Sequence, residues 1–300
     1  SSLDFDAGGN ILSNANYEII GPSGSLDITF DAVRTANIQV DMSRSGSGDL
    51  RLTARDIQLV PGASITHQGS GDISLYSVNA IDVDGDIIQS GGGDISLVVS
   101  NETGIWGSGD IKMGASPATL TINQYGAGFD SRWSGDLTGS GASFIKLGAG
   151  RLILDGNFTQ HTGNTEILAG TLTLDVDGGI RQFGNNSSVN ISTGAFLELS
   201  SPDLGESISL SQLDGGGNIV IDLKGGILEA GSNNINSTFY GVLSGTGGLT
   251  KTGDGSLTLS GANTYTGDTS IDGGSLIVSG SLSDSSDVKV GSGGTYELGA

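Results

Sequence analysis

The chain has 300 residues, of which 53 are glycine and four are proline, and it contains no cysteine. Acidic residues outnumber basic ones by 33 to 12, and the formal net charge of −21 excludes nucleic acid and anionic lipid surfaces as partners. A disulfide framework and a membrane-spanning helix are also excluded, because cysteine is absent and no run of roughly 18 apolar residues occurs.

A short motif recurs between Ser45 and Met113. It reads SGSGDLRL, QGSGDISL, SGGGDISL and WGSGDIKM, with a glycine at the same place in each copy: Gly48, Gly71, Gly93 and Gly109. The spacings are 71−48=23, 93−71=22 and 109−93=16 residues, and the first two fit one coil of a three-stranded β-helix. We expect the glycine to form a turn and the aspartate to accept a hydrogen bond from its own backbone beyond that turn. Each copy then starts one strand.

The acidic run IDVDGD is the best cluster of carboxylates, with Asp82, Asp84 and Asp86 one residue apart. Asp82 and Asp84 would share a strand face, which allows a weak calcium or catalytic role; the competing interpretation is a solvated strand face that ends in an Asp-Gly turn. Asp175 and Asp177 form a similar pair. The two histidines, His67 and His161, have no partner at metal-ligand spacing, and we expect both in loops. No cofactor is predicted.

The densest aromatic group is Trp106, Tyr125, Phe129 and Trp133. Two interpretations stay open: these side chains fill a wider coil, or they form a platform on which sugars stack. We expect residues 124–139 to be an irregular joint. Six Asn-x-Ser/Thr triplets could accept glycans, and most of them are expected by chance in so Asn- and Ser-rich a chain. They begin at Asn101, Asn157, Asn185, Asn186, Asn190 and Asn236.

The second half of the chain contains a longer unit twice, starting at Phe144 and at Leu249. The copies align with one-residue adjustments in loops, and their Leu-x-Leu pairs indicate short strands with one face inside. In the second copy, Asn263, Tyr265, Gly267 and Thr269 belong to the unit, whereas Phe158 and His161 stand in the corresponding loop of the first. The other paired positions are Lys146 with Lys251, Gly148 with Gly253, Gly150 with Gly255, Gly156 with Gly261, Gly163 with Gly267, and Gly170 with Gly274.

Repeated units that cannot bury their apolar face alone must stack, so we predict an all-β, parallel β-helix (β-solenoid) in the shape of an elongated rod. No helical periodicity with a credible cap is present. Residues 1–134 are expected to form coils with the GSGDI-type motif, and residues 135–300 to form coils with the two longer units, continuous with the first part. The chain starts without a signal-peptide pattern and ends in the strand-like TYELGA, so we expect it to be a fragment of a longer protein.

The segment from Leu243 to Gly280 resembles the passenger-associated strand repeat of bacterial autotransporters, and Leu137 to Leu174 resembles a more divergent copy. The resemblance rests on three motifs: the Gly-Leu-x-Lys-x-Gly segment, the Leu-Thr-Leu strand and the Asn-Thr-Tyr-Thr-Gly turn. The GSGDI coils are similar to those of filamentous-haemagglutinin-type exoproteins. The resemblance implies a right-handed helix and export across the outer membrane of a Gram-negative bacterium through a β-barrel translocator. In that family, the strand repeat is thought to aid folding and export.

The first functional hypothesis is therefore a passenger segment of a secreted or surface-exposed adhesin, with host or bacterial glycans or proteins as partners, or with itself in aggregation. The alternatives are a polysaccharide lyase or hydrolase carried on the same fold, and a purely structural stalk. No convergent set of acid, base and cation is evident in the sequence, which favours a protein that is not an enzyme.

Overall fold

The computed structural model describes residues 2–7, 11–13, 17–19, 27–39, 41–101, 103–114, 118–157, 161–175, 181–182, 188–200, 207–215 and 220–299. The chain forms two compact units, Ser1–His161 and Thr162–Ala300, which we call the first and second unit. Each is described by itself. The expected change of motif at residues 134 and 135 falls inside the first unit, between two of its strands.

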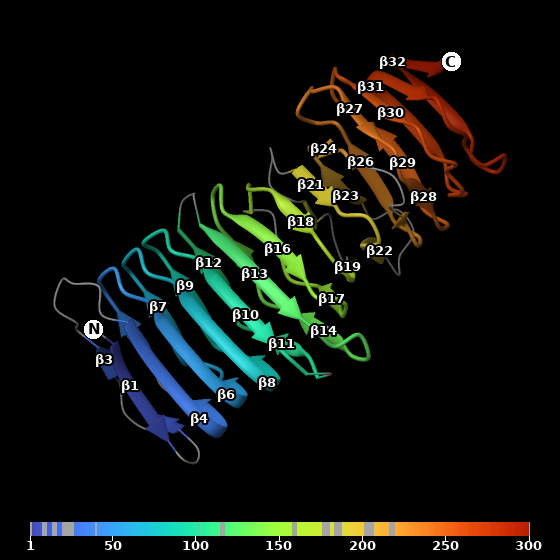
Figure 1. Cartoon of the computed structure of the whole chain (residues 1–300). Helices are drawn as coiled ribbons and strands as arrows, with labels where there is room; N and C mark the ends of the chain where they lie inside the picture. The colour runs from blue at the N-terminus through green and yellow to red at the C-terminus, as the bar shows by residue number, and fades with distance from the viewer. Residues whose placement is uncertain are drawn as a thin grey trace. The chain divides into compact units, whose positions relative to one another are not determined.

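Three columns of parallel strands build the first unit (Figure 1). The strands of one column are β1 (Ser2–Ala7), β4 (Asp27–Ile38), β6 (Leu50–Leu59), β8 (Ile73–Val83), β10 (Ile95–Val99), β13 (Thr119–Gln124) and β16 (Ser143–Leu147). Strands β4, β6 and β8 continue around a corner, where the register shifts, into a second column. That column also holds β2 (Ile11–Ser13), β11 (Ile105–Gly107), β14 (Asp130–Trp133) and β17 (Arg151–Leu154).

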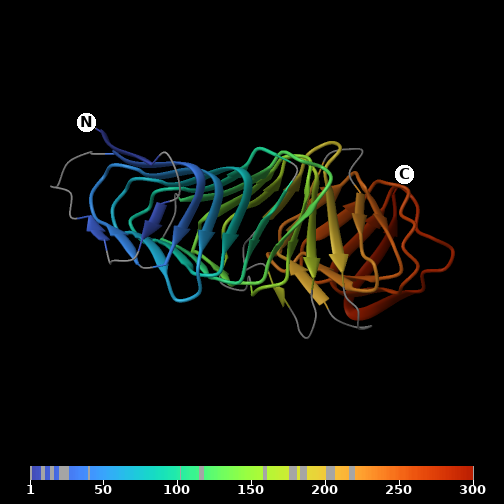
Figure 2. The same ribbon diagram turned by 90° about the horizontal axis from the view of Figure 1, so that it is seen from below.

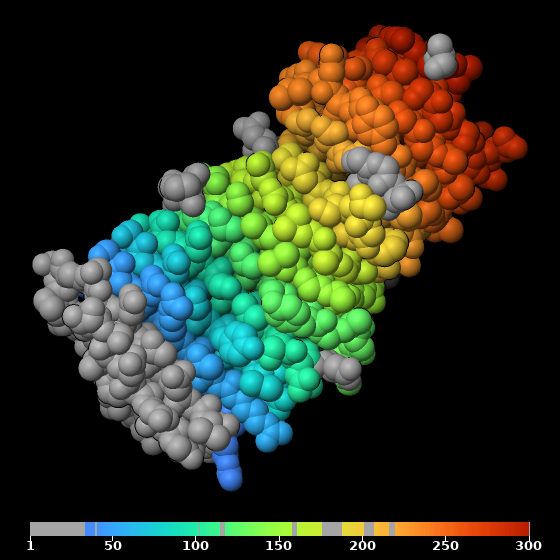
Figure 3. Space-filling model, viewed as in Figure 1, coloured from blue at the N-terminus to red at the C-terminus, as the bar shows by residue number. Residues whose placement is uncertain are grey.

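The third column closes each coil of the first unit. It consists of β3 (Tyr17–Ile19), β5 (Met42–Arg44), β7 (Ser64–His67), β9 (Asp86–Gln89), β12 (Ile111–Met113) and β15 (Leu137–Thr138). Figure 2 shows these coils following one another in sequence order, and in Figure 3 they form successive colour bands on the surface of the unit.

The second unit repeats this plan with shorter strands. One column contains β18 (Thr165–Ile167), β21 (Ser188–Ile191) and β24 (Gln212–Leu213). Another contains β19 (Thr171–Asp175), β22 (Phe196–Ser200), β25 (Val220–Asp222) and β28 (Val242–Ser244). A further column contains β20 (Arg181–Gln182), β23 (Ser207–Leu210), β26 (Ile227–Ala230), β29 (Gly248–Lys251), β31 (Thr269–Val278) and β32 (Val288–Leu298). The second half of β31 also pairs with β30 (Ser256–Leu259), which pairs with β27 (Ser237–Phe239).

The core lies inside the coils, because alternate residues of each strand point inward. In the first unit, Leu52, Leu75, Leu97 and Ile122 occupy one register position in four successive coils, and all are buried. Like side chains thus stack on like up the unit, which is the packing that defines a solenoid.

The all-β prediction and the parallel solenoid are confirmed. No helix of the described part of the chain is long and apolar enough to cross a membrane.

Glycines of the GSGD motif are required by the closeness of successive coils. A Cβ on Gly71 would lie 2.1 Å from the carbonyl oxygen of Gly48, and one on Gly93 would lie 2.0 Å from that of Gly71. The fourth copy of the motif behaves differently, because a Cβ on Gly109 would lie 1.9 Å from the carbonyl oxygen of Gly85. It therefore lies at another corner of the coil, which explains its shorter spacing.

The motif aspartates bind the next coil, which corrects the expectation of a bond within the turn. Asp49 accepts a hydrogen bond from the backbone N–H of Asp72 at 3.0 Å, and Asp72 accepts one from Asp94 at 2.8 Å. At the other corner, Asp110 does the same for Asp136 at 3.0 Å. Each carboxylate thus caps a backbone donor one coil further along the chain.

Residues 124–139 are not an irregular joint, so that expectation was wrong. Strand β14 pairs in parallel with β11 on one side and β17 on the other, and β15 pairs with β12. The aromatic residues misled the prediction because the chain leaves the strands only at two short corners, 125–129 and 134–136, before Leu137.

Candidate functional sites

The lysine of each long repeat is buried at the end of a strand and caps backbone carbonyl groups. Lys251 Nζ donates to the oxygens of Thr252, Gly253 and Gly273 at 2.5, 3.0 and 3.2 Å. Lys146 Nζ donates to Leu147 and Gly148 at 2.8 and 2.9 Å. The two lysines therefore hold the turn that follows them in the same way.

Burial changes the acid–base behaviour of these lysines. It lowers the pKa of Lys146 to about 8. It also lowers the pKa of Lys251, where the nearby carboxylate of Asp254 acts in the opposite direction. Desolvation disfavours the charged amine, whereas the carbonyl oxygens can accept from either form.

The turn glycines of the two repeats adopt matching conformations. The φ angles are +75° at Gly148 and +68° at the paired Gly253, and +69° at Gly170 and +61° at the paired Gly274. A side chain is strained at such angles, so glycine is required there.

Close stacking explains most of the other repeat glycines. A Cβ on Gly156 would lie 1.9 Å from the carbonyl oxygen of Gly135, and one on the paired Gly261 would lie 1.8 Å from that of Gly241. Cβ atoms on Gly150, Gly255 and Gly267 would also approach neighbouring atoms within 2.6 Å, and Gly163 is buried.

Asn263 joins three coils at a buried position. Its Oδ1 accepts from the N–H of Leu243 in the previous coil at 2.9 Å, and its Nδ2 donates to Gly261 of its own coil and Ser281 of the next, both at 3.0 Å. The side chain thus stabilises the stacking of successive coils.

Tyr265 and Thr269 extend this buried network. The Tyr265 hydroxyl bonds the hydroxyl of Thr269 at 2.5 Å, which in turn bonds that of Ser286 at 3.0 Å. Burial raises the pKa of Tyr265. In the first repeat, Thr165 is buried as Thr269 is, and His161 is buried at the place of Tyr265; Phe158 lies outside the described residues.

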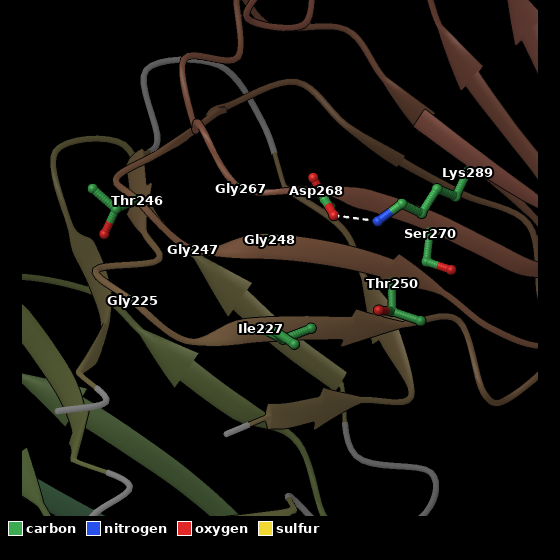
Figure 4. A pocket seen from close by; sticks show the side chains of 10 residues that line it. All are labelled: Gly225, Ile227, Thr246, Gly247, Gly248, Thr250, Gly267, Asp268, Ser270 and Lys289. Carbon is green, nitrogen blue, oxygen red and sulfur yellow. Dashed lines mark hydrogen bonds and ion pairs between the residues drawn. The ribbon is translucent and has the colours of Figure 1, made fainter. Parts of the chain in front are cut away.

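A groove of about 410 Å³ opens on the outer face of the second repeat (Figure 4). Its lining residues come from consecutive coils and include four glycines: Gly225, Ile227, Thr246, Gly247, Gly248, Thr250, Gly267, Asp268, Ser270 and Lys289. Thr250, Ser270 and Lys289 occupy one register position in three coils, and Lys289 pairs with Asp268. The hydroxyl groups and the ion pair suit a polar ligand.

The four predicted aromatic residues separate into two environments. Trp133 is buried and fills the core of the first unit. Trp106, Tyr125 and Phe129 are exposed, and Tyr76 joins them at the corner between the first two strand columns. We call Tyr76, Trp106, Tyr125 and Phe129 the aromatic corner. Sequence reasoning missed Tyr76 because it is isolated from other aromatic residues along the chain.

The acidic run binds separate partners within the first unit. Asp82 lies on β8, where burial and the Asp84 carboxylate raise its pKa. Asp84 accepts from the Ser108 hydroxyl at 2.7 Å, and Asp86 pairs with Lys112 at 2.7 Å. Among the residues that the structure describes, no three His, Cys, Asp or Glu side chains could hold a metal ion. Asp177, of the second acidic pair, lies outside those residues.

Both histidines are buried; His67 lies on a strand instead of the expected loop, whereas His161 lies outside the strands and forms an isolated bridge with Gly139. His67 ends β7; its Nδ1 accepts from the N–H of Gly69 at 3.0 Å, and its Nε2 lies 2.8 Å from the carbonyl oxygen of Gly48. Gln89 occupies the same register position one coil later and accepts from Gly91 at 2.8 Å. Both residues precede the motif aspartate by five positions, a signal that sequence inspection could have found.

Four of the Asn-x-Ser/Thr triplets begin at described residues. Asn101, Asn157, Asn190 and Asn236 are exposed, whereas Asn185 and Asn186 lie outside the described ranges. Asn236 already accepts a hydrogen bond from the N–H of Ser256 at 2.9 Å. The side chain of Asn236 therefore helps to hold two neighbouring coils together.

Comparison with known proteins identifies the two long units. A family profile described as passenger-associated-transport-repeat matches residues 144–174 and 249–278, the segments that align with each other in the sequence. Neither curated proteins nor solved structures give a significant match to the chain.

Proposed function

The chain carries two passenger-associated transport repeats on a parallel β-solenoid, a combination that implies an autotransporter passenger, and we propose that it serves as an adhesive segment displayed outside the cell. In this proposal the two repeats template the folding of neighbouring coils after export across the outer membrane. The exposed outer faces of the strands then provide the contact surface for attachment or aggregation.

The observation that supports templating is that buried polar groups of the second repeat are satisfied across coils. Lys251, Asn263 and Thr269 are each almost fully buried, and each bonds a residue of the next coil. A buried polar group without its partner costs about 1–3 kcal/mol. A coil that has already formed therefore stabilises the coil that adds to it, and folding can propagate from coil to coil.

Refolding kinetics of the purified chain test the templating role. We expect Asn263→Leu to slow the refolding of the second unit after dilution from denaturant, since it removes contacts to both neighbouring coils. Ala262→Ser is the matched control at an exposed neighbouring residue. Refolding of Asn263→Leu at the control rate would contradict templating.

Attachment is tested separately, on cells that display the parent protein with and without residues 1–300. We expect deletion to reduce adhesion to surfaces or cell-to-cell aggregation while the remaining passenger still reaches the surface, as measured by antibody labelling. Unchanged attachment would favour the stalk alternative.

A further inference from the structure

We propose that the aromatic corner of the first unit binds an uncharged polysaccharide. The inference rests on the proposed adhesive function and names its ligand class. Four aromatic side chains are exposed around one corner: Tyr76 at 42 %, Trp106 at 36 %, Tyr125 at 59 % and Phe129 at 51 %. Aromatic surface left in water at one place marks an interaction site.

The register places these side chains on successive coils. Tyr76 pairs with Val98, and Val98 pairs with Asn123, so Tyr76 lies two coils before the strand that leads into Tyr125. At about 4.8 Å per coil, Tyr76 and Tyr125 are about 10 Å apart along the direction of stacking. Phe129 ends the loop that Tyr125 begins, and Trp106 lies on the strand beyond the corner of the intervening coil. The corner thus presents several rings to an extended ligand.

Hydrogen-bonding groups adjoin the rings. Trp106 is paired in register with Asp82 of the previous coil and with Arg132 of the next coil. The register position of Tyr76 is occupied by Val98 in the next coil and by Asn123 in the coil after that. Apolar ring faces beside carboxylate and amide groups match a sugar ring, which has apolar C–H faces and equatorial hydroxyl groups.

Charge selects an uncharged ligand. Arg132 pairs with Asp155, and Arg151 pairs with Asp130 at 3.4 Å, whereas Arg55 lies exposed at the same corner, one coil before Tyr76. The chain as a whole carries a net charge of −21. The net charge therefore repels sulfated or uronic acid polymers, whereas neutral polymers meet no such repulsion.

Affinity electrophoresis of the whole chain tests the proposal. The gels contain neutral polymers, namely dextran, mannan or hydroxyethylcellulose, or the polyuronate alginate. We expect at least one neutral polymer to retard the chain and alginate to have no effect. The double variant Tyr125→Ala/Phe129→Ala should lose affinity at least about tenfold, as expected for loss of aromatic stacking. The matched controls are Tyr240→Ala, an exposed tyrosine of the second unit, and Lys289→Ala in the groove; both should bind as the parent does.

Tryptophan fluorescence gives a second readout. The chain has two tryptophans, and Trp133 is buried, so quenching by acrylamide reports mainly on Trp106. The neutral polymer that retards the chain should protect Trp106 from quenching.

Several results would overturn the proposal: no retardation by any neutral polymer, equal retardation of the double variant, or loss of binding in Lys289→Ala instead. In another outcome, cells that display the protein lose attachment when residues 1–300 are deleted but keep it with Tyr125→Ala/Phe129→Ala. That result would support the adhesive function and contradict the sugar-binding site at the aromatic corner. If the double variant abolishes only self-association, the corner binds a second copy and the proposal is wrong.

Discussion

The ammonium group of Lys251 donates a hydrogen bond to the carbonyl oxygen of Gly273, one coil further along the chain, at 3.2 Å. The same nitrogen also holds the turn that follows Lys251. One buried cation thus fixes both the end of its own strand and the position of its neighbour.

Replacement of Lys251 by methionine should destabilise the second unit by about 2–3 kcal/mol, because three carbonyl groups lose their donor while the apolar stem is kept. Chemical denaturation monitored by circular dichroism measures this loss. Lys289→Met is the control, since Lys289 is exposed and its ion pair with Asp268 lies at the surface. We expect no measurable change for that variant. Equal stability of Lys251→Met and the parent would show that the buried cation is dispensable.

The first unit should become more stable between pH 8 and pH 10. The pKa of Lys146 is lowered to about 8, against about 10.4 in an unfolded chain. Between these values the unfolded state binds more protons than the native state, so stability rises with pH, by at most about 1.4 kcal/mol per unit. Below pH 8 the cost of burying the charge is present in full.

Urea denaturation of the parent chain and of Lys146→Met at pH 7.5, 8.5 and 9.5 measures this dependence. The variant should lack the rise, because it has no amine to titrate. A rise of the same size in both proteins would assign it to other groups.

Gly71→Ala should destabilise the first unit by about 3 kcal/mol, at the upper end of the cost of overpacking. Its Cβ would meet the carbonyl oxygen of Gly48 at 2.1 Å, and a backbone atom cannot move aside as a side chain can. Gly128→Ala is the matched control, because no atom lies within 4 Å of a Cβ there. Thermal unfolding should place Gly128→Ala within about 0.5 kcal/mol of the parent. Similar melting of the two variants would argue against close contact between the coils.

His67→Gln should be tolerated, whereas His67→Leu should cost about 2 kcal/mol. Gln89 shows that an amide can serve one coil away, where Gln89 Oε1 accepts from Gly91 as His67 Nδ1 accepts from Gly69. Leucine fills the space but leaves the N–H of Gly69 without its acceptor. Differential scanning calorimetry should therefore rank the parent and His67→Gln together, above His67→Leu. A loss of stability in His67→Gln as large as that in His67→Leu would mean that the imidazole ring has a role that an amide cannot fill.

Much of the fold could be predicted because it depends on local periodicity. The Leu152/Leu154 and Leu257/Leu259 pairs alternate, and alternation specifies which strand face is buried. The alignment of Lys146 with Lys251 also predicted equivalent positions, which the structure shows to make equivalent contacts.

Features at corners were harder to predict. Gly93 and Gly109 have nearly identical sequence neighbours yet lie at different corners of the coil, because the same short motif can form two kinds of turn. Trp133 and Phe129 are four residues apart, and one is buried while the other is exposed. A corner loop of unknown conformation resets the inside-outside alternation, so the period alone could not separate them.

The carboxylate that reaches from each GSGD turn to the next coil also bears on how such chains change length during evolution. Asp49, Asp72 and Asp94 make the same contact in succession, and the glycines before them stack in the same order. Deletion of residues 71–92 would bring Gly93 to the place of Gly71, with an aspartate again next in sequence and an acceptor below it. Gain or loss of one whole coil therefore preserves every contact at this corner, and the same contact is kept across coils of 23, 22 and 25 residues. Duplications and deletions in the gene are accordingly expected to survive selection in multiples of a coil.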